Sequence, residues 1–401
     1  MQFRWGKFIL VSVSVLNSGL LPAQHSDSLS LRQLERSDLI DFGSRLLSST
    51  FNKADRADPD DGTVHFSVIP VAPARSGSGA ISVSAINASF YADRQSNVST
   101  IYFYPYTNFT TSYGLLLSPY IWLSGNEWNG TGDFRILYNG LRDYGLGSEV
   151  PPHDRTTINH SQFRAYFTGH TRVLPNFYLG AGYNLDYFWG VNEDDPTPET
   201  PSEFEQYIFG TAPTTVSSGI TFNILRDNRR NSVNPRNGFY TALVLRVNRK
   251  AMGSSSEWSS VFFDVRRYKS FSNMRHKILA ARAFYWGSYG DTPYLNLPTT
   301  LDDPSGRAGR GYVTYRFRGA QWLYSEVEYR FDISSGGFLG GVVFANVQSY
   351  SNQVNRFDGV LGAAGFGLRL KFNRLSDTNL TFDVAYGKEG WNWYINLGEY
   401  F

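Results

Sequence analysis

Cysteine is absent from this sequence, and long apolar runs are scarce. Without cysteine there is no disulfide framework, no thiolate metal site and no lipid anchor attached through a thiol. After residue 23, no stretch is both apolar enough and long enough to cross a membrane as a helix. If the mature chain crosses a membrane, it must therefore do so with strands.

A surplus of one charge is also missing. The sequence holds 37 Lys and Arg against 35 Asp and Glu. Removing Arg4 and Lys7, which lie in a predicted signal peptide, leaves 35 of each. Nucleic-acid binding normally needs a basic surplus, so the balanced charge gives no support for a nucleic-acid partner.

Catalytic and metal-binding patterns are equally sparse. There are only six histidines, and after residue 64 His160-Ser161 is the single pair of adjacent histidine and serine residues. Neighbours in a strand point to opposite faces, so these two side chains would not meet. Asp194-Asp195 and the group Asp58, Asp60 and Asp61 could bind Ca²⁺ weakly, but acidic loops are more often simply solvated. We expect no enzyme activity, no cofactor and no metal.

The N-terminus has the pattern of a secretory signal peptide over residues 1–23. Basic residues precede the apolar stretch Phe8–Leu21, and Leu21-Pro22-Ala23 supplies a small residue for cleavage. Residues 24–63 then predict a short amphipathic helix and a charged linker, either covering the mouth of a barrel or acting as a plug or docking element. The apolar side of this helix would be formed by Leu31, Leu34, Leu39, Phe42 and Leu46.

The remainder, residues 64–401, reads as strands and turns throughout. Alternation of apolar and polar residues predicts an all-β chain, a transmembrane antiparallel β-barrel of about sixteen strands in the outer membrane of a Gram-negative cell. An aromatic content of 16% suits the interfacial girdles of such barrels. The predicted strands are His65–Ala74, Ala80–Tyr91, Thr100–Asn108, Gly114–Leu123, Asp133–Asn139, Gln162–Val173, Phe177–Phe188, Val216–Leu225, Phe239–Asn248, Ser260–Tyr268, Lys277–Trp286, Trp322–Ile333, Phe338–Val347, Gly359–Phe372, Asn379–Tyr386 and Trp391–Phe401.

Near the C-terminus, the alternation assigns the two faces of the sheet. Phe366 and Leu368 should face lipid, whereas Arg369 and Asp383 should face the lumen. Placing a basic residue at the bilayer midplane costs roughly 2–4 kcal/mol. That cost fixes the register, and small inward residues such as Gly365 and Gly367 leave room for an inserted loop.

The stretch from Gly306 to Ile333 organises the chain. A polar, glycine-rich loop over residues 287–321 carries Arg310, Gly311 and Tyr312, and a strand with alternating charges follows it. We predict that the loop folds into the lumen and sets Arg310 beside Glu328 or Glu326, because a desolvated guanidinium needs a carboxylate partner.

These motifs resemble the lumen loop and following strand of the BamA/TamA family, the bacterial surface antigen superfamily of outer-membrane barrels. The resemblance rests on Arg310-Gly311-Tyr312, then Arg316-Phe317-Arg318-Gly319, then Glu328-Tyr329-Arg330-Phe331, in family order. Tyr144-Gly145-Leu146-Gly147, the turn Asn234–Gly238 and the closing segment Trp391–Phe401 extend it. The resemblance implies a role in inserting or translocating outer-membrane proteins or lipids, although Arg310 could serve only to pin the loop.

Three departures accompany the resemblance. Asn346 stands where the family usually has an aspartate, so it can accept a hydrogen bond from Arg310 but brings no charge. Gly309 replaces the aliphatic residue usual before the arginine. The N-terminal region is too short for the POTRA repeats that precede most family barrels, which predicts a barrel-only member.

The junction between the first and last strands is the predicted functional region of the barrel. Pro70 and Pro73 each remove a ladder donor from the first strand, and Gly398 weakens a last strand that contains Trp393 and Phe401. A short, openable seam could offer its edge to an incoming strand. The expected partners are outer-membrane lipids, client outer-membrane proteins and other envelope subunits. The alternative is a non-gating structural subunit or passive pore in a larger complex.

Overall fold

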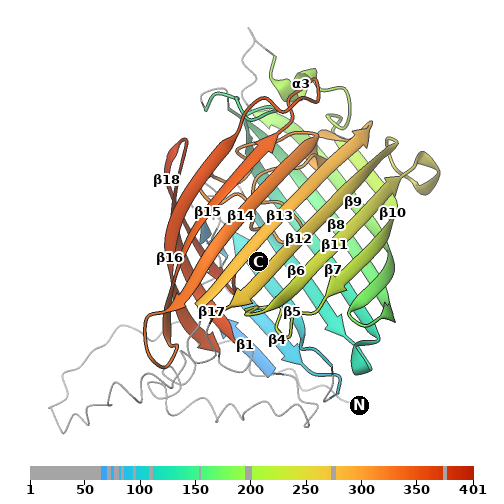
Figure 1. The fold of residues 1–401 in the computed structure, drawn as a ribbon. Helices are drawn as coiled ribbons and strands as arrows, with labels where there is room; N and C mark the ends of the chain where they lie inside the picture. Colours follow the sequence, from blue (N-terminus) through green and yellow to red (C-terminus); the bar gives the residue numbers. More distant parts are fainter. Residues whose placement is uncertain are drawn as a thin grey trace, which may run out of the picture.

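The computed structural model describes residues 65–69, 74–75, 81–82, 85–93, 96–107, 112–152, 155–194, 201–271, 277–373 and 377–401. Fourteen strands, β5 to β18, pair antiparallel in chain order to form one sheet curved into a barrel (Figure 1). Their bounds are β5 Ser99–Thr107, β6 Tyr113–Trp122, β7 Trp128–Asp143, β8 Thr156–Leu174, β9 Phe177–Asp194, β10 Thr214–Asp227, β11 Gly238–Asn248, β12 Trp258–Ser270, β13 Lys277–Gly290, β14 Gln321–Asp332, β15 Leu339–Tyr350, β16 Leu361–Asn373, β17 Thr378–Gly387 and β18 Gly390–Leu397.

Helix is confined to loops in the described part of the chain. The single α-helical turn, α3 (Glu203–Gln206), lies at the end of the barrel that we call the upper mouth; the opposite end is the lower mouth (Figure 1). Among the described residues, no helix is long and apolar enough to cross a membrane. The predicted signal peptide, N-terminal helix and linker lie outside the described residues. The 3₁₀ turns are η1 (Ser124–Asn126), η2 (Lys250–Met252) and η3 (Tyr294–Asn296).

The predicted sidedness of the strands is confirmed. On β14, Leu323 and Val327 are 44% and 46% exposed, whereas Glu326 and Glu328 on the other face are 2% and 0% exposed. A water-soluble protein buries apolar side chains and exposes charges, so this reversed pattern is that of a barrel with lipid outside. Arg369 also lies on the inner face, as predicted.

All fourteen strands predicted from residue 100 onward are present, but several run further than predicted. The clearest case is β7, which spans Trp128–Asp143 where the sequence predicted Asp133–Asn139. Apolar alternation marks only the part of a strand that faces lipid, and the ladder of backbone hydrogen bonds continues beyond it. β8 and β9 extend in the same way.

The N-terminal hairpin appears as four short strands. β1 pairs with β4, and β2 pairs with β3, while β3 and β4 both pair with β5. Among the described residues, no register pair joins β5 directly to β18, so these short strands stand between them. The total of sixteen strands therefore stays a prediction. The bounds are β1 His65–Ile69, β2 Ala74–Arg75, β3 Ile81–Ser82 and β4 Ala85–Phe90.

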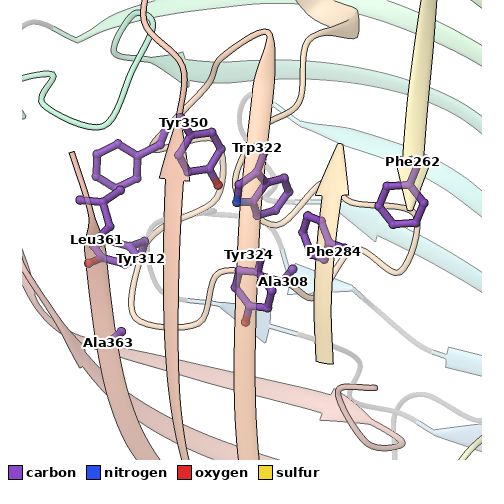
Figure 2. Close-up of a cluster of buried hydrophobic side chains, with 10 residues drawn as sticks. Phe262, Phe284, Ala308, Tyr312, Trp322, Tyr324, Tyr350, Leu361 and Ala363 are labelled. Carbon is purple, nitrogen blue, oxygen red and sulfur yellow. The ribbon is translucent and has the colours of Figure 1, made fainter. Parts of the chain in front are cut away.

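The core lies inside the barrel, between its wall and the loop 291–320, which lies within the predicted range 287–321 (Figure 2). Trp322 stacks on Tyr350 with ring centroids 5.1 Å apart, and Phe284 meets Trp322 edge-on at 4.7 Å. Ala308 and Tyr312 of the loop pack against this aromatic cluster. The loop thus fills the lumen along the wall formed by β12 to β16.

Candidate functional site

The loop between β13 and β14 is shaped by one buried aspartate. Asp303 Oδ1 accepts from the backbone amides of Arg307 at 2.7 Å and Ala308 at 2.8 Å. Its Oδ2 accepts from Arg282 Nη2 on β13 at 2.9 Å. Asp303 therefore bends the loop and ties it to the barrel wall, which presents the next residues to the lumen.

Arg310 sits at the centre of the resulting site and is fully buried. Its Nε donates to Glu326 at 2.9 Å, and its Nη1 donates to Asp383 at 2.6 Å. Its Nη2 contacts both Glu326 and Glu328. The structure thus brings Arg310 together with both glutamates named from the sequence, and it adds a third carboxylate from β17.

Two aromatic rings cover the flat faces of the same guanidinium. Arg310 Cζ lies 3.5 Å from the centroid of Phe344 on β15 and 3.9 Å from that of Tyr400 near the C-terminus. A guanidinium is planar and weakly hydrated, so it can stack on aromatic faces while its edge forms hydrogen bonds. Both its faces and its edge are therefore occupied, which holds the loop apex in one position.

Two further arginines balance the surrounding carboxylates. Arg330 Nη2 lies 2.6 Å from Glu328, and Arg369 bridges Asp383 at 2.5 Å and Glu399 at 2.8 Å. Breaking a buried ion pair by removing one partner commonly costs about 3–5 kcal/mol, because the remaining charge is uncompensated. The whole network is consequently coupled to the presence of Arg310.

Asn346 occupies a different role from the one expected. Its Nδ2 donates to the backbone oxygen of Arg310 at 2.8 Å, so it holds the main chain of the loop and does not accept from the guanidinium. Asn346 brings no charge to the guanidinium, and Asp383 on β17 supplies a carboxylate in addition to the two glutamates. A hydrogen-bond partner at position 346 is thus retained without a charge.

Gly311 and Tyr312 connect the loop to the last strand. The amide of Gly311 donates to the Tyr394 hydroxyl at 2.7 Å, and that hydroxyl donates to the Tyr312 carbonyl at 2.8 Å. Asn392 Nδ2 donates to the Gly311 carbonyl at 2.9 Å. Gly311 has φ +107°, and a Cβ there would collide with Ala363, so glycine is required.

The C-terminal tail turns into the lumen. β18 ends at Leu397, and Gly398 follows with φ +83°, a conformation that favours glycine. Glu399, Tyr400 and Phe401 are then buried, with the Phe401 carbonyl oxygen 3.0 Å from Arg330 Nη2. The closing strand expected to reach the final phenylalanine is therefore four residues shorter, because buried arginines draw the tail inward.

Arg307 fixes this inward turn from the loop side. Its Nη2 donates to the Leu397 carbonyl at 3.0 Å, and its Nη1 contacts the Glu399 carbonyl. Glu399 Oε1 accepts from Asn379 Nδ2 at 2.7 Å on β17. The loop, the tail and the last two strands therefore form one connected unit.

This unit meets the N-terminal strands at β2. Within the described ranges, β18 pairs with β2 at two positions, Tyr394 with Arg75 and Ile395 with Ala74. On its other side it pairs with β17 from Leu397 to Gly390, over eight positions. Trp393 lies on the outer face of β18, 42% exposed. Pro70 and Pro73 lie outside the described residues, so their predicted effect on the seam stays a prediction.

Loops over the upper mouth add a second layer. Phe204 of α3 meets Tyr294 edge-on with ring centroids 5.2 Å apart, in a buried apolar cluster. The neighbouring Glu203 accepts from the amide of Leu146 at 2.5 Å, and burial raises the pKa of the Glu203 carboxyl above its ordinary value. These contacts close the lumen on the side away from the lower mouth.

Lys388 and Glu389, in the β17–β18 turn, join the last strands to this layer. Lys388 Nζ pairs with Glu149 at 3.0 Å, and Glu389 pairs with Arg316 at 2.5 Å. Arg316 Nη2 also donates to the Val150 carbonyl at 2.6 Å. Both ends of β18 are therefore tied to loops that lie inside or over the lumen.

Several of these residues were not named as site residues from the sequence. Arg369 and Asp383 were assigned to the lumen by alternation, but nothing in the local pattern says that they meet Arg310. Tyr394 and Tyr400 lie in the segment predicted as the closing strand, and nothing in that prediction says that they reach Gly311 or Arg310. Their contacts depend on which strands become neighbours. In the described part of the chain, no group of three His, Asp or Glu residues is placed to hold a metal ion.

Comparisons with known proteins place the fold. The chain matches the structure of BamA from Haemophilus ducreyi lacking POTRA domains 1–3 with TM-score 0.51 and 13% identity, over 83% of this chain and 70% of that one. It matches CdiB from Acinetobacter baumannii with TM-score 0.51 and 10% identity, over 84% of this chain and 65% of that one. No family model and no curated protein matches the sequence. The chain therefore shares the barrel fold of these proteins, as its motifs predicted.

Proposed function

We propose that this chain is an outer-membrane barrel that assists the insertion or translocation of outer-membrane proteins or lipids through the seam between its first and last strands. In this proposal the lower mouth faces the periplasm, the chain is exported by the signal peptide 1–23, and residues 24–63 form a periplasmic N-terminal region. Its partners are membrane lipids and client proteins or other envelope subunits.

The junction of β18 with β2 is the observation that carries the proposal. In the part of the chain that the structure describes, two register pairs join β18 to β2, whereas eight join it to β17. Each ladder position contributes backbone hydrogen bonds that have no water to replace them within the bilayer. Among the described residues, β18 is thus joined to β2 by fewer ladder positions than to β17. An edge freed on the β2 side could pair with an incoming strand.

The contacts between the loop and β18 give the buried ion-pair network around Arg310 a role in holding β18. β18 cannot move away from β2 as a unit without carrying Tyr394 and Asn392, which hold Gly311. Movement of β18 would therefore pull on Arg310 and its carboxylates. In this view the network holds the seam strand in its resting position, and opening of the seam competes with it.

Disulfide trapping provides the test, since the chain has no native cysteine. Ala74→Cys with Ile395→Cys would lock β18 to β2, and Phe382→Cys with Ile395→Cys would lock the same strand to β17. The full chain in phospholipid vesicles would be assayed for acceleration of the folding of an added eight-stranded outer-membrane barrel. We expect oxidation to abolish acceleration only for the first pair, and reduction to restore it.

The matched pair separates the seam from general rigidity, because both pairs share position 395. If both oxidised variants kept the folding activity of their reduced forms, a seam that opens between β18 and β2 would be excluded. Loss of activity in both would mean that any restraint on β18 is harmful, which would also contradict the proposed site of opening. Each variant must show the same heat-modifiable gel mobility as the parent when reduced.

A non-gating structural subunit is the second candidate, and the filled lumen favours it over a passive pore. The loop places Arg310, Phe317 and Tyr312 in the interior as fully or almost fully buried residues. Planar-bilayer recordings would separate these possibilities. A structural subunit should show almost no conductance and no folding activity, whereas a passive pore should conduct steadily.

A further inference from the structure

Four basic side chains cluster on the outer face of the barrel, at the lower ends of β10, β12 and β13. They are Arg226, Arg267, Lys269 and Lys277, and all four are exposed. They continue the same outward rows as Phe222, Ile224, Phe263 and Leu279, which are 54%, 39%, 42% and 41% exposed. The basic patch therefore begins where the apolar band ends, on the side that faces the membrane.

Strand register places the four charges in one continuous strip. Arg226 lies over the ring of Phe239 at 5.7 Å, and Phe239 pairs across β11 and β12 with Arg267. Lys269 follows on the same face of β12, about 7 Å further along, given a rise of ~3.4 Å per residue. Lys277 begins the adjacent strand β13, two positions before Leu279, which pairs with Lys269.

No protein carboxylate neutralises this strip among the described residues. The four side chains have no ion pair there, in contrast to the inward Arg266, which lies 2.6 Å from Asp264. The outward residues that flank the patch are aromatic, Phe239 on β11 and Phe331 on β14. The sequence between β12 and β13, residues 271–276, also contains no acidic residue. The sheet thus gathers like charges without supplying their counter-charge.

Such crowding is unfavourable unless an external anion completes it. Like charges on neighbouring strands repel, and this repulsion grows where lipid lowers the dielectric constant. At the membrane surface the available anions are lipid phosphates, and clustered Lys and Arg at this depth recognise anionic head groups. Arginine can clasp a phosphate with two parallel hydrogen bonds, while lysine adds charge without fixed geometry.

We propose that this strip is a binding site for anionic glycerophospholipid, with the phosphate held by Arg267, Lys269 and Lys277 and the acyl chains lying on the apolar rows above. Phe239 and Phe331 border the site and cover the glycerol region. The site lies on the β10–β13 wall and does not involve the seam. It therefore fixes the barrel in a defined lipid environment on the face away from the proposed opening.

Lipid titration of the purified full chain in zwitterionic detergent tests this, with bound lipid counted by native mass spectrometry. The probes are phosphatidylglycerol and phosphatidylcholine with identical acyl chains. We expect phosphatidylglycerol to bind more tightly, with an affinity that falls as salt rises. Arg267→Gln with Lys269→Gln should weaken its binding about thirtyfold, because each basic residue near an anionic surface contributes about 1 kcal/mol.

Arg249→Gln with Lys250→Gln is the matched control. These adjacent, exposed residues at the upper mouth undergo the same change in charge. Equal weakening by both double variants, or equal binding of the two phospholipids to the parent, would overturn the proposal. Tighter binding of lipid A than of phosphatidylglycerol would overturn the assignment to glycerophospholipid. Heat-modifiable gel mobility checks folding, and the single variants Arg267→Gln and Lys269→Gln serve if the double variant does not fold.

Discussion

Arg310 on the lumen loop and Asp383 on β17 form an ion pair of 2.6 Å between Nη1 and Oδ2, although 73 positions separate them in the chain. Both side chains are fully buried. This pair joins the loop to the hairpin that contains the last strand. The contact makes a loop far from the C-terminus part of the mechanical support of β18.

Replacing Arg310 should destabilise the barrel strongly. Arg310→Ala leaves three buried carboxylates with a partner missing, and we expect a loss of about 3–5 kcal/mol in the free energy of unfolding. Urea unfolding of the refolded chain, followed by tryptophan fluorescence, measures it. Arg310→Lys keeps the charge but loses the planar fork, so it should be intermediate. An alanine variant as stable as the parent would show that the cage does not hold the loop.

Replacing Asn346 with aspartate should lower the free energy of unfolding. Asn346 donates to the Arg310 carbonyl, and a carboxylate there would face that oxygen without a proton to share. We expect Asn346→Asp to cost about 1–3 kcal/mol, the usual penalty for an unsatisfied buried group. The same urea experiment applies. A gain in stability would mean that the new carboxylate is recruited by a guanidinium, contrary to the observed geometry.

Changing Gly398 should release the C-terminal tail. A Cβ at this position would meet Val233 Cγ1 at 3.5 Å, an ordinary van der Waals distance. Gly398→Ala would therefore cause no steric clash, and its effect would come from the positive φ of +83°. A left-handed conformation costs an L-residue about 1–2 kcal/mol. We expect carboxypeptidase to remove Phe401 faster from the variant than from the parent. Identical rates would indicate that the tail is held by its side chains alone.

The loop that contains α3 should be held more firmly in acid. Burial raises the pKa of Glu203 in the folded state, so the carboxylate is disfavoured there relative to the unfolded loop. The stabilising contribution is complete below the unfolded pKa and is lost as pH rises through the raised value. Proteolysis of the segment 201–213 should therefore be slower at pH 4 than at pH 7. Glu203→Gln should remove most of this difference, whereas Glu205→Gln, on the solvent side of α3, should leave it.

The closing strand shows where local pattern stops being informative. Trp391, Trp393 and Ile395 alternate as a lipid-facing row should, and the structure keeps them on β18. The same row continues with Leu397 and, after Glu399, with Phe401, yet the chain leaves the sheet at Gly398. The reason is not local, because the tail is drawn inward by Arg307, Arg330 and Arg369, which come from a distant loop and two other strands.

The sequence by itself determined the class of the protein. Lipid outside and polar groups inside impose a period of two on every crossing strand, and that period is visible without any knowledge of the partners of a strand. It therefore placed fourteen strands, assigned Arg369 and Glu328 to the lumen, and marked the loop of Arg310 as an insertion. These are properties of one segment at a time.

Only the tertiary structure decided which inward groups meet. A strand pattern gives the face of a side chain but not its height in the barrel or the loop that reaches it, since both depend on register and curvature. For that reason the sequence could not predict that Asp383 is a third carboxylate at Arg310. Nor could it predict the hydrogen bond between Tyr394 and Gly311 or the inward turn of the C-terminal tail. The pairing of β18 with β2 belongs to the same group, because it is a relation between the two ends of the barrel sequence.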